Sequence, residues 1–242
     1  MGVIVKKAVY KRVLLKLSGE ALIGQQNFGI DPAALKLICN NVKSMTDFGV
    51  EVAIVIGGGN LFRGEALAAT GFDRVTCDQV GMLATVMNGL ILRDSFLNAG
   101  ITANLMSSIA MQGVVETYNR AQAIDYLIHK NVVIFVAGTG CPLFSTDSAA
   151  SLRGIEVNAD ILLKATKVDG VYSSDPKIDK NASFYKTLTY QQVLEKQLRV
   201  MDAAAVVLCR DYKLPVRVFN MNKINILQDL IFGAEHGTFI GA

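Results

Sequence analysis

Three short apolar runs that end in glycine- or lysine-bearing segments constrain the fold of this chain more than any other feature. The runs have the length of β-strands and span residues 12–17, 52–56 and 161–164, and the segments at their ends begin at Lys16, Gly57 and Lys164. Open α/β sheets form their sites in loops at the carboxyl ends of parallel strands. Backbone N–H groups of glycine-rich turns bind phosphate oxygens, because glycine permits close approach and a positive φ. We therefore expect a polyphosphate site, of the kind used for phosphoryl transfer.

Strand and helix signals alternate along almost the whole chain. Strands are expected at 12–17, 52–56, 101–106, 132–136, 161–164, 216–220 and 238–240, and a short hairpin is expected at 168–173, where Asp169-Gly170 favours a tight turn. Helix-capping residues precede the helical segments, namely Asp31, Asn119, Thr146 or Asp147, and Thr189. This alternation predicts an α/β fold, a three-layer, doubly wound and mainly parallel sheet with helices on both faces. No linker divides the chain, so one domain over residues 1–242 is expected.

The composition excludes several classes of protein. Apolar residues make up 51% of the chain, as expected when parallel strands are covered by helices on both faces. The net charge of +3 is small and no Lys/Arg cluster is interleaved with aromatic residues, so no nucleic-acid partner is expected. The four cysteines lie far apart without metal-ligand spacing, which predicts reduced, structural thiols.

No membrane partner is expected either. No apolar stretch approaches the ~20 residues that cross a bilayer. The basic segment Met1–Arg12 precedes an apolar run that is too short for a signal sequence. These features predict a cytoplasmic protein.

The longest predicted helix, from about residue 73 to residue 99, is apolar on more than one side. One apolar stripe comprises Val80, Leu83, Met87 and Leu90, and other apolar residues lie off it. Such a helix is either enclosed in the core or packed against another subunit. The pattern alone favours neither alternative.

Lys16 is the first candidate for chemistry. It has leucine on both sides at the end of a buried strand, where a lysine is costly unless it meets an anion. One interpretation is a cation that contacts a transferring phosphoryl group, and the other is a strand-end lysine that reaches water. The neighbouring Gly19 favours the first, because it allows the backbone to wrap a phosphate.

Gly57-Gly58-Gly59 form the second junction. Three successive glycines raise the entropic cost of folding, so their presence calls for a functional reason. Phosphate binding at a helix N-terminus supplies such a reason. Arg63 can grip a second phosphate, although a solvated helix arginine is the commoner case. The chain has no Walker A sequence, no Gly-x-Gly-x-x-Gly and no protein-kinase motif.

Two further junctions offer polar groups. Residues 139–150 join a strand to a helix and bring hydroxyls, backbone amides and a helix N-terminus to one place, which suits a second anion. Taken alone, Asp147 in this stretch is better explained as a helix N-terminal charge. The junction at 164–175 supplies cations, a ring and carboxylates from Lys164, Thr166, Lys167, Asp169, Tyr172 and Asp175.

With these residues in place, the chain closely resembles the bacterial UMP kinases of the amino acid kinase superfamily. The resemblance runs from about Tyr10 to the C-terminus and includes the blocks 11–22, 57–64, 146–154 and 165–172. The blocks 81–90 and 217–221 are the most specific to UMP kinases. The resemblance implies an amino acid kinase fold.

The resemblance also implies transfer of a phosphoryl group from ATP to UMP. Mg²⁺ would be carried mostly by ATP, with no metal site formed by the protein alone, and Lys16 and Asp147 would be catalytic. The residues implied to bind ATP are Lys16, Leu17, Ser18, Gly19, Gly59, Arg63, Thr166, Tyr172 and Asp175. The residues implied to bind UMP are Gly58, Arg63, Asp78, Thr139, Gly140, Cys141, Pro142, Leu143, Phe144, Ser145 and Thr146. The N-terminal part would thus bind mainly UMP and the C-terminal part mainly ATP.

Assembly and regulation are implied in the same way. The resemblance implies a homohexamer with the long helix between subunits, and inhibition by UTP. The residues implied to take part in activation by GTP are Gly24, Gln25, Gln26, Asn27, Phe28, Gly29 and Arg93. Members with a well-formed GTP site can have His or Arg where this chain has Leu97, Asn104 and Asn131, so weak or absent activation by GTP is expected.

Three other functions are compatible with parts of the sequence. A kinase of the same superfamily that acts on a carboxylate or carbamate needs no second phosphate site, which Arg63, Asp78 and residues 139–146 argue against. A catalytically silent nucleotide-binding regulator would not need both Lys16 and Asp147. A nucleic-acid-binding regulator has only the small positive charge in its favour.

Overall fold

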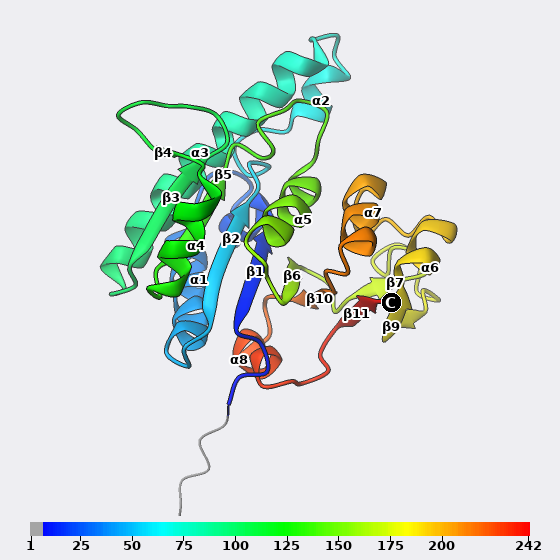
Figure 1. The fold of residues 1–242 in the computed structure, drawn as a ribbon. Helices are drawn as coiled ribbons and strands as arrows, with labels where there is room; N and C mark the ends of the chain where they lie inside the picture. Colours follow the sequence, from blue (N-terminus) through cyan, green and yellow to red (C-terminus); the bar gives the residue numbers. More distant parts are fainter. Residues whose placement is uncertain (1–6) are drawn as a thin grey trace, which may run out of the picture.

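A nine-stranded sheet forms the middle layer of the computed structural model, which describes residues 7–242 (Figure 1). The sheet has the order β4-β3-β5-β2-β1-β6-β10-β11-β9, and every neighbouring pair is parallel except β10 with β11. Its strands are β1 (Arg12–Leu17), β2 (Glu51–Ile56), β3 (Ala103–Ser107), β4 (Glu116–Thr117), β5 (Val132–Val136), β6 (Ile161–Thr166), β9 (Thr187–Thr189), β10 (Val216–Asn220) and β11 (Thr238–Gly241). The basic segment predicted at Met1–Arg12 begins outside the described residues.

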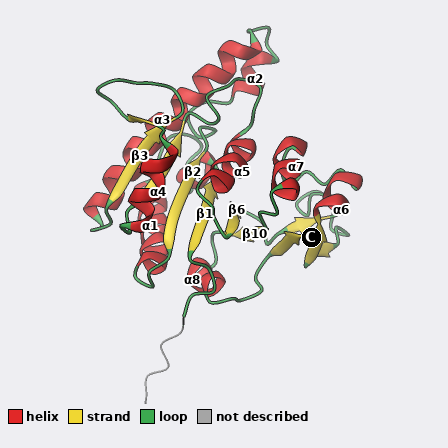
Figure 2. Cartoon of the chain, viewed as in Figure 1, coloured by secondary structure: helices red, strands yellow, loops and turns green. Residues whose placement is uncertain are grey.

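The central strands are buried on both faces, which explains why they read as continuous apolar runs. Along β1, Val13, Leu15 and Leu17 belong to one core, and Leu14 belongs to the core on the other face. The first core packs α1 (Pro32–Thr46), α3 (Arg74–Asn98) and α8 (Ile226–Ile231) against the sheet. The second contains α4 (Arg120–Ile128), α5 (Thr146–Glu156), α6 (Tyr190–Glu195) and α7 (Ala203–Asp211) (Figure 2). The predicted three-layer, mainly parallel α/β fold is confirmed.

Most of the predicted helix starts are confirmed by their capping bonds. The side chains of Asp31, Asn119 and Thr189 each accept a hydrogen bond from a backbone N–H in the first turn that follows. The prediction for α5 was one residue off, because Ser145 is the N-cap instead of Thr146 or Asp147. The Ser145 hydroxyl accepts from the backbone N–H of Asp147 at 3.0 Å, so the carboxylate of Asp147 is not needed for capping.

The hairpin predicted at residues 168–173 is wrong. Strand β7 (Val171–Tyr172) pairs with β8 (Phe184–Tyr185), so the two strands enclose a long connection and form a separate sheet. Gly170 does not adopt the positive φ that the expected turn needs. Its backbone instead packs against Thr238, whose hydroxyl accepts from the N–H of Val171 at 2.8 Å. Elements as short as 3₁₀-helix η1 (Gly19–Leu22) and α2 (Gly64–Ala68) were missed because they have no measurable periodicity.

Helix α3 spans nearly the residues predicted for it, but the expectation that no apolar stretch approaches membrane-spanning length is wrong for this helix. It is long and apolar enough to cross a membrane by length and composition. It packs along the sheet with Met82, Leu92 and Phe96 in the core, which makes it the core helix of a folded α/β domain. Its opposite side leaves Leu83 and Met87 about half exposed. In the single chain, one side of α3 is therefore buried in the core and the other side is uncovered.

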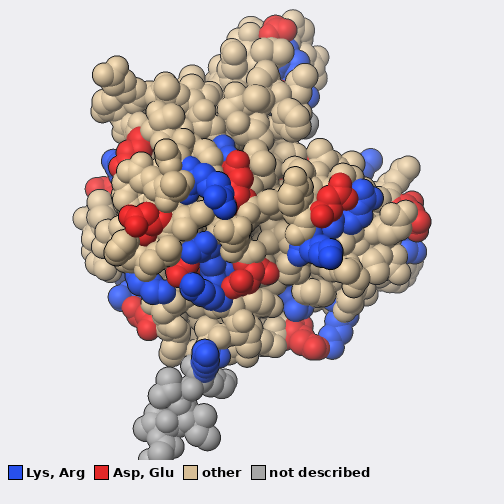
Figure 3. Space-filling model, viewed as in Figure 1, with Lys and Arg blue, Asp and Glu red and all other residues tan. Residues whose placement is uncertain are grey.

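The visible surface carries mixed charges. On the face drawn in Figure 3, Lys and Arg side chains lie beside Asp and Glu side chains over the lower part of the molecule. The upper part, which contains one end of α3, is mostly uncharged in this view. This face shows no extended area of one sign, in keeping with the net charge of +3.

Candidate functional site

The order of strands reverses direction between β1 and β6. The chain moves from β1 outward through β2 on one side of the sheet, and from β6 outward through β10 on the other side. In doubly wound sheets the crevice at the carboxyl ends of two such strands is the usual ligand site. Lys16 of β1 and Lys164 of β6 are direct partners in the parallel register across this point. The topology therefore places two lysines side by side where a ligand is expected.

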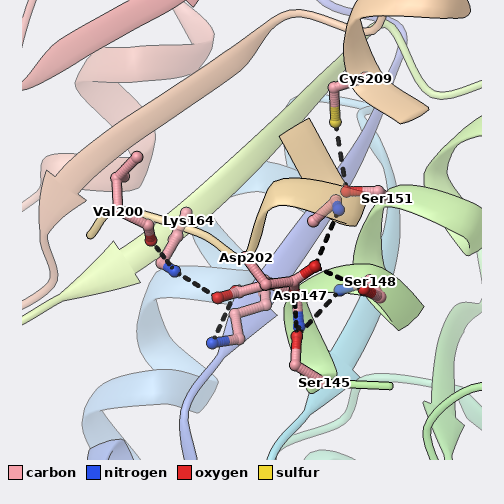
Figure 4. A network of polar contacts seen from close by, with 10 residues as sticks. Ser145, Asp147, Ser148, Ser151, Lys164, Val200, Asp202 and Cys209 are labelled. Atoms are coloured by element: carbon pink, nitrogen blue, oxygen red, sulfur yellow. Dashed lines mark hydrogen bonds and ion pairs between the residues drawn. The ribbon is translucent and has the colours of Figure 1, made fainter. Parts of the chain in front are cut away.

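Asp147, at the start of α5, lies between the two lysines, and Figure 4 shows it beside Lys164. Its Oδ1 is 2.9 Å from the Nζ of Lys16, and its Oδ2 is 2.7 Å from the Nζ of Lys164. Only 8% of Lys16 and 9% of Lys164 is exposed, so these are buried charges. Burial acts to raise the pKa of the Asp147 carboxyl, but the two ammonium groups outweigh it and hold that pKa below its usual range. Burial lowers the pKa of Lys164, and the charge of Lys16 adds to this effect against the opposing attraction of Asp147.

A second carboxylate holds the start of α5 in place. Asp202, the N-cap of α7, accepts hydrogen bonds from the hydroxyl groups of Ser145 and Ser148 (Figure 4). Lys164 also donates to the backbone carbonyl of Val200, two residues before Asp202. The sequence gave no sign that Asp202 meets α5. Lys164 was noticed as a cation, but its pairing with Asp147 depends on a strand register that the sequence does not reveal.

The two glycine-rich loops abut each other beside this cluster. A Cβ on Gly19 would lie 2.6 Å from the backbone N of Gly59, and a Cβ on Gly58 would lie 2.8 Å from the Cβ of Ala84 in α3. Neither these two glycines nor Gly57 and Gly59 have a positive φ, so the positive-φ explanation for these loops is wrong. Close packing requires glycine at 19 and 58, whereas Gly59 faces open space.

A buried pair of asparagines fixes the second loop. The Nδ2 of Asn88 in α3 donates to the carbonyl of Gly57 at 2.7 Å, and Asn60 and Asn88 are hydrogen-bonded to each other through their side chains. Asn60 also donates to the carbonyl of Gly29 at 3.0 Å. The segment 24–29, predicted to be regulatory, is thereby connected directly to the glycine loop.

Arg63 lies near these loops with its side chain 64% exposed. Its guanidinium is 2.7 Å from the Oε1 of Glu20, and the Nζ of Lys167 is 3.8 Å from the other oxygen of the same carboxylate. Glu20 therefore contacts two cations, one from the segment after β2 and one from the segment after β6. The sequence placed Arg63 at the site but gave no role to Glu20.

The segment between β5 and α5 crosses towards the start of α3 (Figure 1). Its Leu143 donates a backbone hydrogen bond of 2.8 Å to the Oδ2 of Asp78, whose other oxygen pairs with Arg74. Thr139 turns the chain through reciprocal hydrogen bonds with the backbone of Cys141. Leu143 and Phe144 are exposed. The structure thus brings together Asp78 and residues 139–146, which the sequence predicted to share one ligand.

A pocket of about 690 Å³ opens next to Lys164. Thr166, Tyr172 and Asp175 line it, so three of the residues implied to bind ATP share one cavity. Tyr172 stacks edge-on against Phe184, with ring centroids 5.3 Å apart, and Asp175 caps the turn that follows it. A second pocket of about 440 Å³ lies between Ser18, Gly24, Gln25 and α1.

The remaining predicted regulatory positions lie away from the two glycine loops. Arg93 is on the second half of α3, and Leu97 one turn later is half exposed. Asn131 donates to the side chain of Asn104 at 3.1 Å, so these two neutral residues are neighbours. The structure therefore gathers no cluster of cations around Arg93 from these three positions.

Metal ligands are sparse in the part of the chain that the structure describes. No group of three or more His, Cys, Asp or Glu side chains there has the arrangement of a metal site. The Oδ1 of Asp147 is buried and makes no hydrogen bond, although Lys16 lies beside it. The contact of this oxygen with Lys16 is therefore an ion pair without a hydrogen bond of regular geometry.

Comparisons with known proteins agree with this geometry. The family model of the amino acid kinase family matches residues 11–220. The uridylate kinase of Pectobacterium atrosepticum is 57% identical over 234 residues, which cover 97% of each chain. The solved UMP kinase of Bacillus anthracis has a TM-score of 0.92 and 42% identity over 96% of each chain. The solved uridylate kinase of Archaeoglobus fulgidus has a TM-score of 0.73 at 26% identity, over 95% of this chain and 99% of its own. This chain therefore belongs to the amino acid kinase family and, within it, to the uridylate kinases.

Proposed function

We propose that this enzyme transfers the γ-phosphoryl group of ATP to UMP and releases ADP and UDP. The observation that carries the proposal is the buried Lys16–Asp147–Lys164 cluster at the switch point of the sheet, between the glycine loops and a pocket of about 690 Å³. The relatives named uridylate kinase support UMP as the acceptor. One domain would perform the reaction, with its N-terminal part binding mainly UMP and its C-terminal part mainly ATP.

The side of the site that would bind ATP is formed mainly by the segments that follow β1 and β6. Lys16, Ser18 and Gly19 would hold the phosphates of ATP, together with Leu17, Gly59 and Arg63. Thr166, Tyr172 and Asp175 would bind the nucleoside, and their common pocket supports this. The cluster has two lysines and one carboxylate, so it keeps an excess positive charge where polyphosphate charge needs to be neutralised.

The acceptor side is formed by Gly58, Arg63, Asp78 and residues 139–146. The bond between Leu143 and Asp78 supports a shared pocket, in which Asp78 would bind the ribose and Arg63 the phosphate. A kinase for an amino acid or carbamate would not need this second phosphate site. Because the phosphate of UMP is already anionic, the reaction needs positioning and charge stabilisation more than a general base.

Kinases that use ATP generally work with a divalent metal ion, and we propose Mg²⁺ here. The ion would bind mainly to the phosphates of ATP, where it neutralises charge that develops during transfer. The Oδ1 of Asp147, which pairs with Lys16 at 2.9 Å but makes no hydrogen bond, fits a position beside such an ion. The protein's own part is to hold the lysines and this carboxylate in fixed positions.

We also propose that the enzyme is a homohexamer in the cytoplasm, with α3 between subunits. The exposed ridge of α3 consists of Val80, Leu83, Met87 and Ile91, which share one face at helical spacing. Apolar residues aligned in this way on a surface favour association with another chain.

Regulation is proposed to differ between two nucleotides. UTP would inhibit by occupying the UMP pocket at Arg63 and residues 139–146. GTP would activate weakly or not at all, because Arg93 lacks cationic neighbours at 97, 104 and 131. Segment 24–29 would carry any effect of GTP to the catalytic loops through Asn60.

The proposed reaction predicts that ADP release depends on UMP. We expect ADP from ATP and Mg²⁺ with UMP, and little with CMP, glutamate, aspartate or carbamate, in a coupled assay. The Arg63→Ala variant should raise the KM for UMP about 10–150-fold and change the KM for ATP far less, because a charge-assisted contact is worth about 1.5–3 kcal/mol. Arg210→Ala, which removes an exposed arginine paired with Asp211, is the matched control. Preference for a carboxylate acceptor, or equal effects of Arg63→Ala on both nucleotides, would contradict the proposal.

Replacement of the central cation is expected to remove turnover but not the fold. Lys16→Met should lower kcat at least ~10²-fold, the effect of losing one preorganised charge, while Asp147 keeps its pairing with Lys164. Circular dichroism and the coupled assay measure fold and rate. Lys43→Met, which removes an exposed lysine of α1, should leave both unchanged. A folded Lys16→Met enzyme with near-normal turnover would refute the role of Lys16.

Initial rates measure the predicted regulation. At fixed ATP and UMP, addition of GTP should change the rate little, because each contact to a triphosphate adds only ~1.5–3 kcal/mol and water competes for it. Addition of UTP should lower the rate, and extra UMP should relieve the inhibition. Several-fold activation at micromolar GTP would show that other cations form the site.

Sedimentation of the enzyme tests the assembly. The parent should sediment as a hexamer, and the double variant Leu83→Asp/Met87→Asp should give smaller species, because two carboxylates would be buried without partners. Ile178→Asp alters an exposed apolar residue away from α3 and should leave the hexamer intact. A monomeric parent, or a hexameric double variant, would rule out the α3 contact.

A further inference from the structure

The segment that follows β5 has an unusual backbone. Ala137, Gly138, Gly140 and Leu143 all have a positive φ, between 55° and 82°. For alanine and leucine this conformation costs roughly 1–2 kcal/mol each, so other contacts need to hold it. The same segment contains the residues proposed to surround UMP. Whatever fixes its backbone therefore also fixes the acceptor pocket.

Two hydroxyl groups hold the start of this segment. The buried Thr85 of α3 accepts a hydrogen bond from the N–H of Ala137 at 2.7 Å. Ser108, just after β3, donates to the carbonyl of Gly138 at 2.7 Å. Ser108 also packs against Gly140, where a Cβ would lie 3.1 Å from the Ser108 carbonyl oxygen. The segment is thus fixed from two neighbouring elements.

Ser108 is itself held by a buried arginine. The Nη2 of Arg153 donates to the Ser108 hydroxyl at 2.9 Å, so the hydroxyl accepts from one side and donates to the other. Arg153 is only 5% exposed, and its guanidinium lies 3.8 Å above the ring of Tyr118 while it pairs with Glu156. Its Nε has no hydrogen-bond partner. Burying a guanidinium that has one N–H without a hydrogen-bond partner costs free energy. The pairing with Glu156 alone does not explain why this arginine is buried.

Arg153 also connects this contact to the catalytic cluster. It lies on α5, the helix whose first turn contains Asp147. The contacts from Arg153 through Ser108 to Gly138 therefore connect the helix whose Asp147 pairs with both lysines to the segment that would bind UMP. Glu156 and Tyr118 keep the guanidinium in place, since Tyr118 donates to the same carboxylate at 2.8 Å.

We propose that Ser108 and Arg153 are positioning residues that set the acceptor segment relative to α5. They do not touch the nucleotides, and they act through the carbonyl of Gly138. The inference rests on the proposed function, because it assigns UMP to residues 139–146. It adds that the affinity for the acceptor, and not for ATP, depends on this buried contact.

The test is Ser108→Ala. Loss of the hydroxyl oxygen removes both the bond from Arg153 and the bond to the carbonyl of Gly138. We expect the KM for UMP to rise about 3–10-fold, as for the loss of one or two hydrogen bonds, and the KM for ATP to stay within twofold. Ser44→Ala is the matched control, because Ser44 is also half-buried and its hydroxyl also donates to one backbone carbonyl, that of Asn41. A merely structural role would lower thermal stability without separating the two KM values.

Arg153→Lys provides the second variant if Ser108→Ala does not fold. A lysine can still pair with Glu156, but it lacks the forked donors that reach Glu156 and Ser108 together. The same selective rise in the KM for UMP is expected. Unchanged KM values, or equal rises for both nucleotides, in a folded variant would overturn the inference while the parent's activity with UMP leaves the proposed function standing. A parent inactive with UMP would overturn the proposed function and this inference with it.

Discussion

One carboxylate shared by two buried lysines is the interaction on which the site depends. Lys16 and Lys164 are register partners on neighbouring parallel strands, which lie about 4.8 Å apart, so their charges repel in a place with little water. Desolvation costs several kcal/mol for each buried ion unless counter-charge and hydrogen bonds offset it. Asp147 supplies that charge, and the cluster keeps one positive charge in excess. A polyphosphate is the kind of ligand that would neutralise this excess charge.

This requirement also explains how the start of α5 is built. Because Asp147 has to face the sheet, another residue has to cap the helix, and Ser145 does so. Ser145 and Ser148 in turn donate to Asp202, which caps α7. Two helix starts are therefore fixed by one hydrogen-bonded group, and the carboxylate of Asp147 is left with one oxygen that makes no hydrogen bond.

The sequence predicted those parts of the fold that depend on local pattern. Strand β1, the N-caps Asp31, Asn119 and Thr189, and the parallel order follow from apolar runs, capping chemistry and βαβ alternation. The same reasoning identified Lys16 as a buried cation that needs an anion. It could not find Asp202 or the pairing of Lys164, because these depend on strand register and on packing between distant segments.

Errors in the prediction arose where tertiary contacts override local preference. Asp169-Gly170 favours a tight turn in isolation, but packing against Thr238 at the start of β11 holds Gly170 in another conformation. Glycine was expected at 19 and 58 because it permits close approach to phosphate and a positive φ. Neither glycine has a positive φ, and both are required because loop backbone and α3 lie within contact distance of them. The sequence reports that a glycine is present, but only the folded structure distinguishes conformational freedom from close packing.

The cations of the site fall into two groups with different freedom to move. Lys16 and Lys164 are buried, and removing a partner from a buried ion pair costs roughly 3–5 kcal/mol, so these lysines stay where the sheet holds them. Arg63 is mostly exposed and is paired with Glu20, and an exposed pair contributes only about 0–1 kcal/mol. An incoming phosphate can therefore replace Glu20 as the partner of Arg63 at a small cost in free energy. The buried lysines do not move, so the phosphate has to bind at the positions where the sheet holds them. In the proposed reaction, this difference makes the donor side a fixed template and gives the acceptor side an arginine that can follow its ligand.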